Sequence, residues 1–367
     1  MSEGLPTDII VGVDTHKHTH AAVAITRLGA RLGELTIQVS LGGYRELETW
    51  ARSLGVVRAF GIEGTGSYGA GLARFLREEG HAIHEVGRPD RRLRRQRGKT
   101  DHLDAEGAAR AVLGGQATAL PKSGTGEVEM IRHLKVARDT AVKARTQAML
   151  ALKAVVIGAP AALRERLEAI TGKMALVRHL AALRPGPLTT TTASAKASLR
   201  AIARRWLDLD AEIRVHDVHL GRLTERCAPE MVAAHGVGSG TAAEMLILVG
   251  DNPERIRSEA ALAKLCGACP IPASSGKTNR HRLHRGGHRQ ANAALHRVVV
   301  VRMRTHQPTV DYARRRAAEG KSKREIIRCL KRLVAREIFG YLCRPPRANL
   351  RLTTIGASVP RDALAGL

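Results

Sequence analysis

The chain has 367 residues, which is enough for two or three domains with a sizeable buried core. It carries 60 lysine and arginine residues against 34 aspartate and glutamate residues, a formal net charge of +26 that favours a polyanionic partner, most simply nucleic acid. With three Phe, four Tyr and two Trp, it lacks the rings that a base-stacking platform for single strands needs on one face. We therefore expect contacts to phosphate groups to dominate.

The cysteines and the N-terminus bear on the compartment. The five cysteines are an odd set without disulfide-like spacing, which favours a reducing compartment. The first residues lack the basic and apolar segments of a secretion signal, and no uninterrupted apolar run approaches the ~18 residues that a membrane span needs. We expect a soluble, cytoplasmic protein without a membrane partner.

The first 120 residues alternate between predicted strands and helices. Three strands come first, followed by a helix, a strand, a helix, a strand and a last helix. Alternation of this kind predicts a sheet that is covered by helices. The predicted strands are residues 9–13, 21–26, 35–39, 56–62 and 82–86, and the predicted helices lie at residues 44–54, around residues 72–76 and from residue 101 onward.

Four acidic residues fall at the ends of these elements. Asp14 follows the first strand and Glu63 the fourth, and Asp101 and Asp104 lie three residues apart, on one face of the last helix. Because the carboxyl ends of adjacent parallel strands meet, these side chains can converge, and converging carboxylates repel one another unless a divalent cation neutralises them. Hard oxygen ligands favour Mg²⁺ or Mn²⁺, which can clamp the oxygens of a phosphodiester exchange. The plainer alternative is two turn residues and an ion-paired helix start.

A dense basic run stands directly before the acidic pair, and we interpret it as a grip on nucleic acid. The glycines at residues 64–69 match a dinucleotide-binding pattern, but the acidic residue that such a site requires is not obvious, since Arg88 stands near its place. We therefore expect a tight turn beside the metal site. The basic run includes Arg91, Arg92, Arg94, Arg95, Arg97 and Lys99.

Three stretches carry a resemblance to a known family, namely VGVDTHKHTHAAVAI, GIEGTGSYGAGLARFL and KTDHLDAEGAARAVL. The layout resembles the ribonuclease-H-like fold and, within it, the RuvC-like nucleases. Together the stretches resemble the N-terminal domain of the DEDD-type insertion-sequence transposases, which are named after four acids. The resemblance implies that Asp14, Glu63, Asp101 and Asp104 are catalytic metal ligands.

The middle of the chain predicts a helical arm. Steps of four and three residues predict a coiled-coil seam, but periodicity does not name its partner, which is either another subunit or a helix of the same chain. Residues 161–183 and 199–223 are also predicted helices, with a loop at residues 186–198 between them. The predicted seam consists of Met130, Leu134, Ala137, Ala141, Ala144, Ala148, Ala151 and Val155.

The last third of the chain carries a second candidate site. A glycine-rich turn at residues 236–243 resembles a helix-hairpin-helix, whose turn amides bind phosphate. The proline- and serine-containing stretch beyond it resembles the second half of the same transposase family, although His288 and Arg289 stand where a Gly-Asn pair is expected. The resemblance implies that a serine attacks DNA and becomes covalently linked to it, and we choose Ser275, with Ser274 in reserve. The neighbouring cations are expected to bind nucleic acid or stabilise the transition state: Lys277, Arg280, Arg282 and Arg285.

The same stretch allows a structural alternative. Cys266 and Cys269 are followed by His281 and His284, which resembles a zinc site, although the two histidines are closer together than in a zinc finger. The serine could then belong to an ordinary Ser-Gly turn. Beyond this stretch, residues 298–304 and 323–342 are predicted helices.

The predicted fold class is α/β followed by mainly α. We expect a ribonuclease-H-like, RuvC-like domain in residues 1–120, a helical coiled-coil arm in 121–228, a helical serine transposase domain with a helix-hairpin-helix-like element in 229–345, and a tail in 346–367. The resemblance implies an Mg²⁺-dependent transposase that acts on donor and target DNA, is guided by a structured noncoding RNA, and works as a dimer or tetramer with active sites shared between subunits. The alternatives are a RuvC-like junction nuclease that uses metal-activated water, and a non-catalytic nucleic-acid-binding protein.

Overall fold

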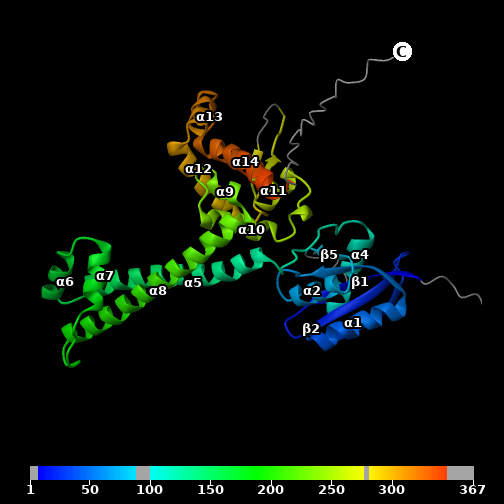
Figure 1. Cartoon of the computed structure of the whole chain (residues 1–367), viewed down its shortest axis with the longest axis horizontal. Helices are drawn as coiled ribbons and strands as arrows, with labels where there is room; N and C mark the ends of the chain where they lie inside the picture. Colours follow the sequence, from blue (N-terminus) through cyan, green and yellow to red (C-terminus); the bar gives the residue numbers. More distant parts are fainter. Residues whose placement is uncertain (1–6, 88–99, 277–280, 345–367) are drawn as a thin grey trace, which may run out of the picture.

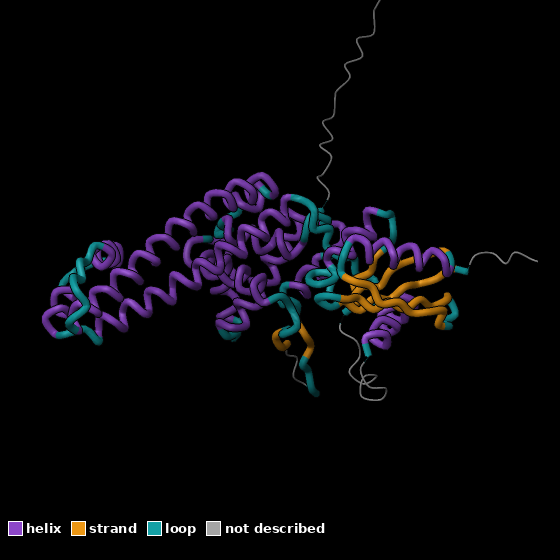
Figure 2. Tube along the Cα trace, turned by 90° about the horizontal axis from the view of Figure 1, so that it is seen from below, coloured by secondary structure: helices purple, strands orange, loops and turns teal. Residues whose placement is uncertain are grey.

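The computed structural model describes residues 7–87, 100–276 and 281–344. The molecule is elongated, with a sheet at one end, a helical arm at the other and a helical C-terminal region between and beside them (Figure 1). Figure 2 shows the same separation from below, with the strands of the large sheet gathered at one end of the helical part. Within the described residues, no helix is long and apolar enough to cross a membrane.

The sheet of the N-terminal region has five strands in the order β3-β2-β1-β4-β5. The strands are β1 (Asp8–Thr15), β2 (Thr19–Thr26), β3 (Arg31–Gln38), β4 (Val56–Glu63) and β5 (Ile83–Val86). β1 and β2, and β2 and β3, are antiparallel, whereas β1, β4 and β5 run parallel to one another. β1 and β2 are buried along almost their whole length, which fits their nearly continuous apolar sequences. This mixed sheet is consistent with the expected ribonuclease-H-like fold.

Helices cover both faces of this sheet. α1 (Leu41–Leu54) and α2 (Ala70–Glu78) pack on one face, where they share a core with Ile9 and other side chains of β1 and β4. α4 (Asp101–Leu113) packs on the opposite face, together with Ile10. The predicted order of strands and helices is confirmed in this region.

A close approach between β1 and α4 sets the position of α4. A Cβ atom at Gly12 of β1 would lie 1.9 Å from the carbonyl oxygen of Ala105 and 2.4 Å from the amide nitrogen of Ala109. Only glycine at this strand position lets the helix backbone lie directly against the strand, and the alanines supply a helix face without bulk. The N-terminal turn of α4 is thereby held next to the carboxyl end of β1.

The arm is a hairpin of two long helices within one chain. α5 (Glu127–Ile157) and α8 (Thr191–Cys227) lie side by side along its length (Figure 1), and the short helices α6 (Ala161–Glu168) and α7 (Lys173–Ala181) close its tip. The partner of the predicted seam that the structure shows is therefore a helix of the same chain.

Two details of the predicted arm are wrong. Met130, the first seam position, is 51% exposed, and the neighbouring Ile131 is fully buried instead, because the start of α5 packs against α10 as well as α8. Of the other seam positions, Ala141 and Ala148 are buried as expected, whereas the rest are only half-buried. The expected loop at residues 186–198 is also too long, because Thr190 caps α8 through its side chain and the helix begins one residue later.

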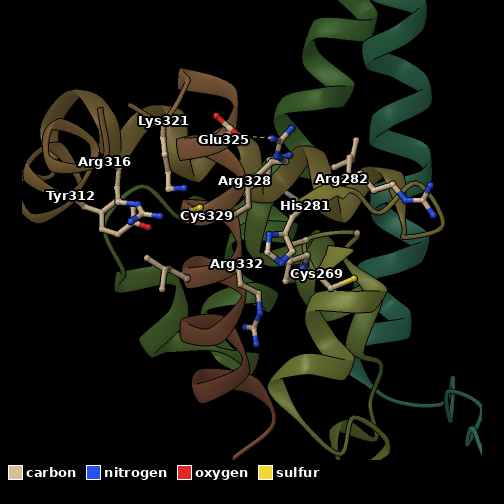
Figure 3. A pocket seen from close by; sticks show the side chains of 16 residues that line it. Cys269, His281, Arg282, Tyr312, Arg316, Lys321, Glu325, Arg328, Cys329 and Arg332 are labelled. Atoms are coloured by element: carbon tan, nitrogen blue, oxygen red, sulfur yellow. Dashed lines mark ion pairs between the residues drawn. The ribbon is translucent and has the colours of Figure 1, made fainter. Parts of the chain in front are cut away.

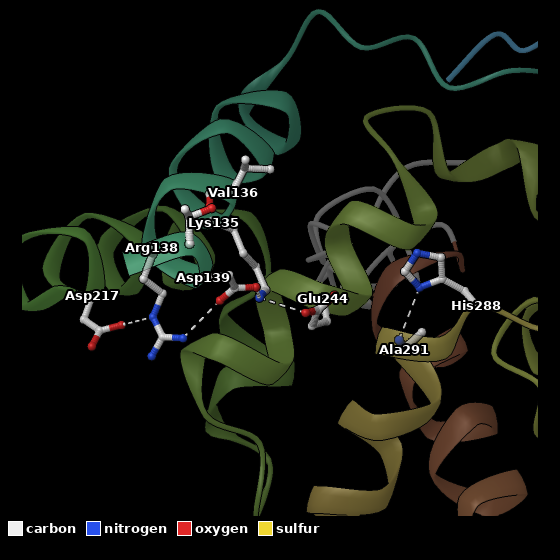
Figure 4. Close-up of polar contacts among 9 residues, drawn as sticks. Lys135, Val136, Arg138, Asp139, Asp217, Glu244, His288 and Ala291 are labelled. Carbon is white, nitrogen blue, oxygen red and sulfur yellow. Dashed lines mark hydrogen bonds and ion pairs between the residues drawn. The ribbon is translucent and has the colours of Figure 1, made fainter. Parts of the chain in front are cut away.

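The root of the arm is joined to the C-terminal region by an ion network that is buried at Lys135 and Glu244 (Figure 4). Nζ of Lys135 on α5 lies 2.5 Å from Oδ2 of Asp139 and 2.8 Å from Oε1 of Glu244 on the neighbouring α10. Arg138 extends the network to Asp217 of α8, with a separation of 2.7 Å. Because a buried cation requires such partners, Lys135 holds the three helices in one arrangement.

The C-terminal region is a helical bundle around one large core. Its centre includes Met245, Leu295 and Val334, and the base of the arm belongs to the same core. One helix, at residues 307–318, was not expected from the sequence, and the helix expected at residues 298–304 is longer than expected. The elements are α9 (Pro229–Ala233), α10 (Ser239–Val249), the 3-10 helix η1 (Pro253–Arg255), α11 (Glu259–Leu265), β6 (Pro270–Pro272), β7 (His281–Leu283), α12 (Arg289–Thr305), α13 (Gln307–Ala318) and α14 (Lys323–Leu342).

Candidate active site

The carboxyl ends of β1 and β4 bring two of the predicted acids to the same edge of the sheet. Val13 is paired with Ile62 in the parallel register, so that Asp14 and Glu63 each follow one residue later on neighbouring strands. Oγ1 of Thr15 donates a hydrogen bond of 2.8 Å to the carbonyl oxygen of Glu63, which ties the two strand ends together.

The first turn of α4 supplies the other two acids. Thr100 caps this helix, because its hydroxyl accepts a hydrogen bond of 3.2 Å from the amide of Leu103. Asp101 is the first residue of the helix and is exposed, whereas Asp104, one turn later, is only 5% exposed and faces the sheet. The cap therefore fixes where the acidic turn begins.

His16 lies between acids from the two elements. Its Nε2 atom is 3.2 Å from Oδ2 of Asp14 and 3.2 Å from Oδ1 of Asp101. The sequence analysis did not select this histidine as a site residue. Its spacing of two residues from Asp14, at the end of a strand, could have indicated that both side chains leave the same face of the sheet.

The electrostatics of the site favour a bound cation. Burial raises the pKa of Asp14, His16 lowers it, and the nearby carboxylates of Asp104 and Asp101 raise it further. This crowding of negative charge is what a divalent cation relieves. The ligand atoms of Asp14, His16 and Asp101 lie within 4.8 Å of one another, and no other such group occurs in residues 7–87, 100–276 and 281–344. The residues therefore fit a metal ion.

The glycine-rich segment after β4 forms a tight turn against this site. Gly64 has φ of 71°, a conformation that favours glycine, and its carbonyl accepts a hydrogen bond of 2.9 Å from the amide of Ser67. A Cβ atom at Gly69 would lie 3.1 Å from both the carbonyl oxygen of Glu63 and Cγ2 of Thr15. The glycines thus let the chain turn beside the strand ends.

The candidate nucleophile lies in the C-terminal region, on a different part of the chain from the acids. Ser275 and Ser274 are exposed, in the segment between β6 and β7. Both views show strands β6 and β7 apart from the five-stranded sheet (Figures 1 and 2). Arg282 lies on β7, and Arg285 lies between β7 and α12.

His288, which stands where the family pattern has a different residue, caps α12 by accepting a hydrogen bond of 3.3 Å from the amide of Ala291 (Figure 4).

Several predicted phosphate-binding residues fall outside the described ranges. The predicted residues that lie outside the described ranges are Arg91, Arg92, Arg94, Arg95, Arg97, Lys99, Lys277 and Arg280.

The zinc alternative finds no support in the described part of the chain. Cys266, Cys269, His281 and His284 are all described, yet they do not bring three ligand atoms together. Cys266 is fully buried, and this burial raises the pKa of its thiol to about 12. A neutral thiol in an apolar core is a packing residue and a poor metal ligand.

Comparison with known families identifies the chain as an enzyme that cuts and rejoins DNA. A DEDD transposase model matches residues 11–159, and a model described as the transposase IS116/IS110/IS902 family matches residues 232–314. The two matches together cover more than half of the chain, and the chain belongs to the IS110 family of DEDD transposases. No curated protein matches it. The first match contains all four acids and the second contains Ser275, and the acids of this family imply a divalent metal.

Proposed function

We propose that this transposase cuts and rejoins DNA with an Mg²⁺ site formed by Asp14, Glu63, Asp101 and Asp104 and with Ser275 as the nucleophile. The observation that carries the metal site is the convergence of Asp14 and Asp101 on one point, where His16 lies 3.2 Å from each. Carboxylate oxygens are the ligands that Mg²⁺ prefers. When bound, the metal would neutralise charge on the phosphate and activate oxygens for exchange.

The four proposed metal ligands come from two parts of the fold. Asp14 and Glu63 would be held rigidly, because they end two paired strands of the sheet. Asp101 and Asp104 would approach from α4. The cap of this helix and its close contact with β1 fix the position of its first turn relative to the strand ends. A site on strand ends and a capped helix keeps its geometry better than one on free loops.

In the proposed chemical step, Oγ of Ser275 attacks a DNA phosphorus atom. The Oγ–P bond forms as the bond from phosphorus to the leaving DNA oxygen breaks, and the serine proton is transferred to that oxygen. A DNA hydroxyl then attacks the phosphoserine and releases the serine, so the number of phosphodiester bonds is conserved. Because a serine hydroxyl is a weak nucleophile, the step needs the acidic site beside it.

This requirement supports an active site shared between subunits. The small two-stranded sheet next to Ser275 lies apart from the five-stranded sheet in both views (Figures 1 and 2). We propose that the serine of one subunit meets the acids of another within a dimer or tetramer. A structured noncoding RNA that pairs with donor and target DNA would then recognise the DNA sequence. The net charge of +26 would serve to bind the phosphate backbones of the nucleic acids.

Trapping a covalent protein–DNA adduct tests the nucleophile. With a DNA substrate nicked beside the cleavage site, Mg²⁺ and the element's RNA, wild-type protein should form an adduct that mass spectrometry maps to Ser275. The Ser275→Ala variant should form none, and the matched Ser274→Ala variant should form it normally. Full strand cleavage by Ser275→Ala would instead indicate a nuclease that uses metal-activated water. Loss of the adduct on omission of the RNA would support RNA guidance, and undiminished adduct would contradict it.

A further inference from the structure

A cavity of about 470 Å³ opens under the hairpin that carries Ser275. His281 and Arg282 of β7 line the cavity on the side of the hairpin. On the opposite side it is lined by α13, which contributes Tyr312, by α14, and by Lys321 between these two helices (Figure 3). Its volume lies in the range of pockets that enclose a small ligand. The cavity is therefore a candidate binding site, and it is separate from the acidic site on the sheet.

Positive charge dominates its lining. Six cationic side chains face a single carboxylate, that of Glu325. Three of the six have a carboxylate partner, since Arg316 pairs with Glu319, Arg328 lies 4.0 Å from Glu325, and Arg332 lies 3.0 Å from Glu259. For the other three no ion pair occurs among the described residues, so the lining keeps an excess of positive charge. The three are Arg282, Lys321 and Lys331.

Among the described residues, two of the lining arginines keep one buried donor atom without an acceptor, whereas Lys331 already has an acceptor. Nζ of Lys331 donates to Oδ1 of Asn292 at 2.7 Å, and burial lowers the pKa of this lysine. Nε of Arg316 and Nη1 of Arg332 are buried without a hydrogen-bond partner. An unmet buried donor is unfavourable, and more so when it is charged. Such donors point to a ligand that brings several anionic acceptor oxygens.

The cavity also has an apolar side. Tyr312 is the one aromatic residue in the lining, and Leu283 and Leu333 line the cavity with it. Tyr312 and Leu333 also line a neighbouring hollow of about 200 Å³. A flat apolar ring next to a cluster of cations matches a molecule with a planar base and a phosphate, since any base can stack on a tyrosine and any phosphate oxygen can accept from arginine or lysine.

We propose that this cavity binds a single nucleotide turned out of a nucleic-acid strand, with its phosphate on Lys321 and Arg316 and its base against Tyr312, which lie together at one end of the cavity (Figure 3). β6 ends at Pro272, three residues before the candidate serine, and β7 contributes Arg282 to the cavity. A nucleotide held here would fix the register of the strand beside Ser275. The inference rests on the action of the protein on nucleic acid, but not on Ser275 as the nucleophile.

Binding of short single strands to the full-length protein tests the cationic half. Fluorescence anisotropy with a 12-nucleotide mixed sequence, once as DNA and once as RNA, identifies which strand the cavity takes. In at least one arm, Lys321→Ala and Arg316→Ala should each raise Kd about tenfold, because each removes a charge-assisted contact. The control is Arg324→Ala, an exposed cation of α14 outside the lining, which should change Kd less than about twofold. Equal losses for Lys321→Ala and Arg324→Ala, or no loss in either arm, would overturn the proposal.

Photocrosslinking tests the base contact. Strands with 5-iodouracil placed at one position at a time should crosslink to Tyr312 from a single position. Tyr312→Leu should lose this crosslink and raise Kd about tenfold, whereas Tyr312→Phe keeps the ring and should bind within about twofold of wild type. Crosslinks spread over many positions would mean a diffuse electrostatic surface and would contradict the pocket. Because binding and crosslinking need no cleavage, their outcome is independent of the covalent-adduct experiment.

Discussion

Glycine 12 shows how one residue positions half of the acidic site. A methyl group at this position would collide with the backbone of α4, at the carbonyl oxygen of Ala105 and the amide nitrogen of Ala109. Backbone at this distance cannot move aside as a flexible side chain can. The first turn of α4, with Asp101 and Asp104, therefore keeps its place because β1 has no side chain there.

Gly12→Ala is accordingly expected to damage both stability and activity. Overpacking of this kind costs about 1–3 kcal/mol, and relief by a shift of α4 would move its acids away from Asp14. Thermal unfolding and the yield of covalent DNA adduct measure the two effects. The control is Gly107→Ala on α4 itself, where a Cβ meets no atom within 4 Å and helix propensity improves by about 1 kcal/mol. A Gly12→Ala protein with wild-type stability and activity would contradict this account of the packing.

Asp14 gives a second prediction at the same scale. Its buried carboxylate is crowded by those of Asp101 and Asp104, so Asp14→Asn should leave the metal-free protein as stable as wild type or more stable. Mg²⁺ should stabilise wild type by about 1.4 kcal/mol at ten times its Kd, and should not stabilise the variant. Differential scanning fluorimetry with and without Mg²⁺ measures both effects. The control Asp208→Asn, an exposed position on α8, should respond to Mg²⁺ as wild type does. An unchanged Mg²⁺ response in Asp14→Asn would exclude this aspartate as a ligand.

At the scale of elements, an ion pair joins two helices of the C-terminal bundle. Arg302 of α12 donates two hydrogen bonds, of 2.6 and 2.8 Å, to the carboxylate of Glu337 on α14. The side chain of Arg302 is almost fully buried, so its charge depends on this partner. The hydrogen bonds from Arg302 hold the pKa of Glu337 below its usual value.

This pair makes the bundle sensitive to acid. A carboxyl pKa that is lower in the folded than in the unfolded state contributes stability above the unfolded value of about 4.3, and this contribution is lost as the pH falls through the lower folded value. Glu337→Gln should therefore destabilise the bundle by about 2 kcal/mol at pH 7 and reduce its loss of stability on acidification. Hydrogen exchange of α12 and α14 amides between pH 7 and pH 3 reports this locally. Asp311→Asn, which breaks the exposed pair with Arg314, should cost less than about 0.5 kcal/mol, and an equal effect of both variants would refute the prediction.

The elements also show what the sequence could and could not predict. Strands β1 and β4 were predictable because continuous β-branched runs end at an acid, and α14 because its apolar period is regular and Ser322 and Glu325 form a capping box. α13 was missed because it buries little, with Thr309 as its one buried residue, so its sequence carries no clear apolar stripe. The contribution of His16 and the cavity under the hairpin depend on contacts between distant segments, which periodicity does not encode.

At the scale of the whole molecule, the arm extends away from the sheet and from the C-terminal bundle (Figure 1). The hairpin of α5 and α8 buries its apolar seam within one chain, so it can extend from the core without a partner helix. Hydrophobic side chains nevertheless remain exposed along it, including Leu150 at 63% and Ile157 at 67%. The sheet with Asp14 and the bundle with Ser275 thus occupy separate parts of an elongated molecule, as the proposed sharing of an active site between subunits requires.

An active site shared between subunits makes a prediction that no single variant can test. Asp14→Asn removes a ligand from the acidic site, and Ser275→Ala removes the proposed nucleophile, so each protein alone should form no covalent DNA adduct. If the two sites meet across subunits, a mixture that has been allowed to exchange subunits contains assemblies with one intact acidic site facing one intact serine. The mixture should therefore recover adduct formation, with the adduct found only on the chain that carries Asp14→Asn, which a mass tag on one variant reveals. A double variant mixed with wild type serves as the control for exchange. Without recovery in the first mixture, but with proven exchange, the acids and the serine must act within one chain, and the hairpin would have to move to the sheet during catalysis.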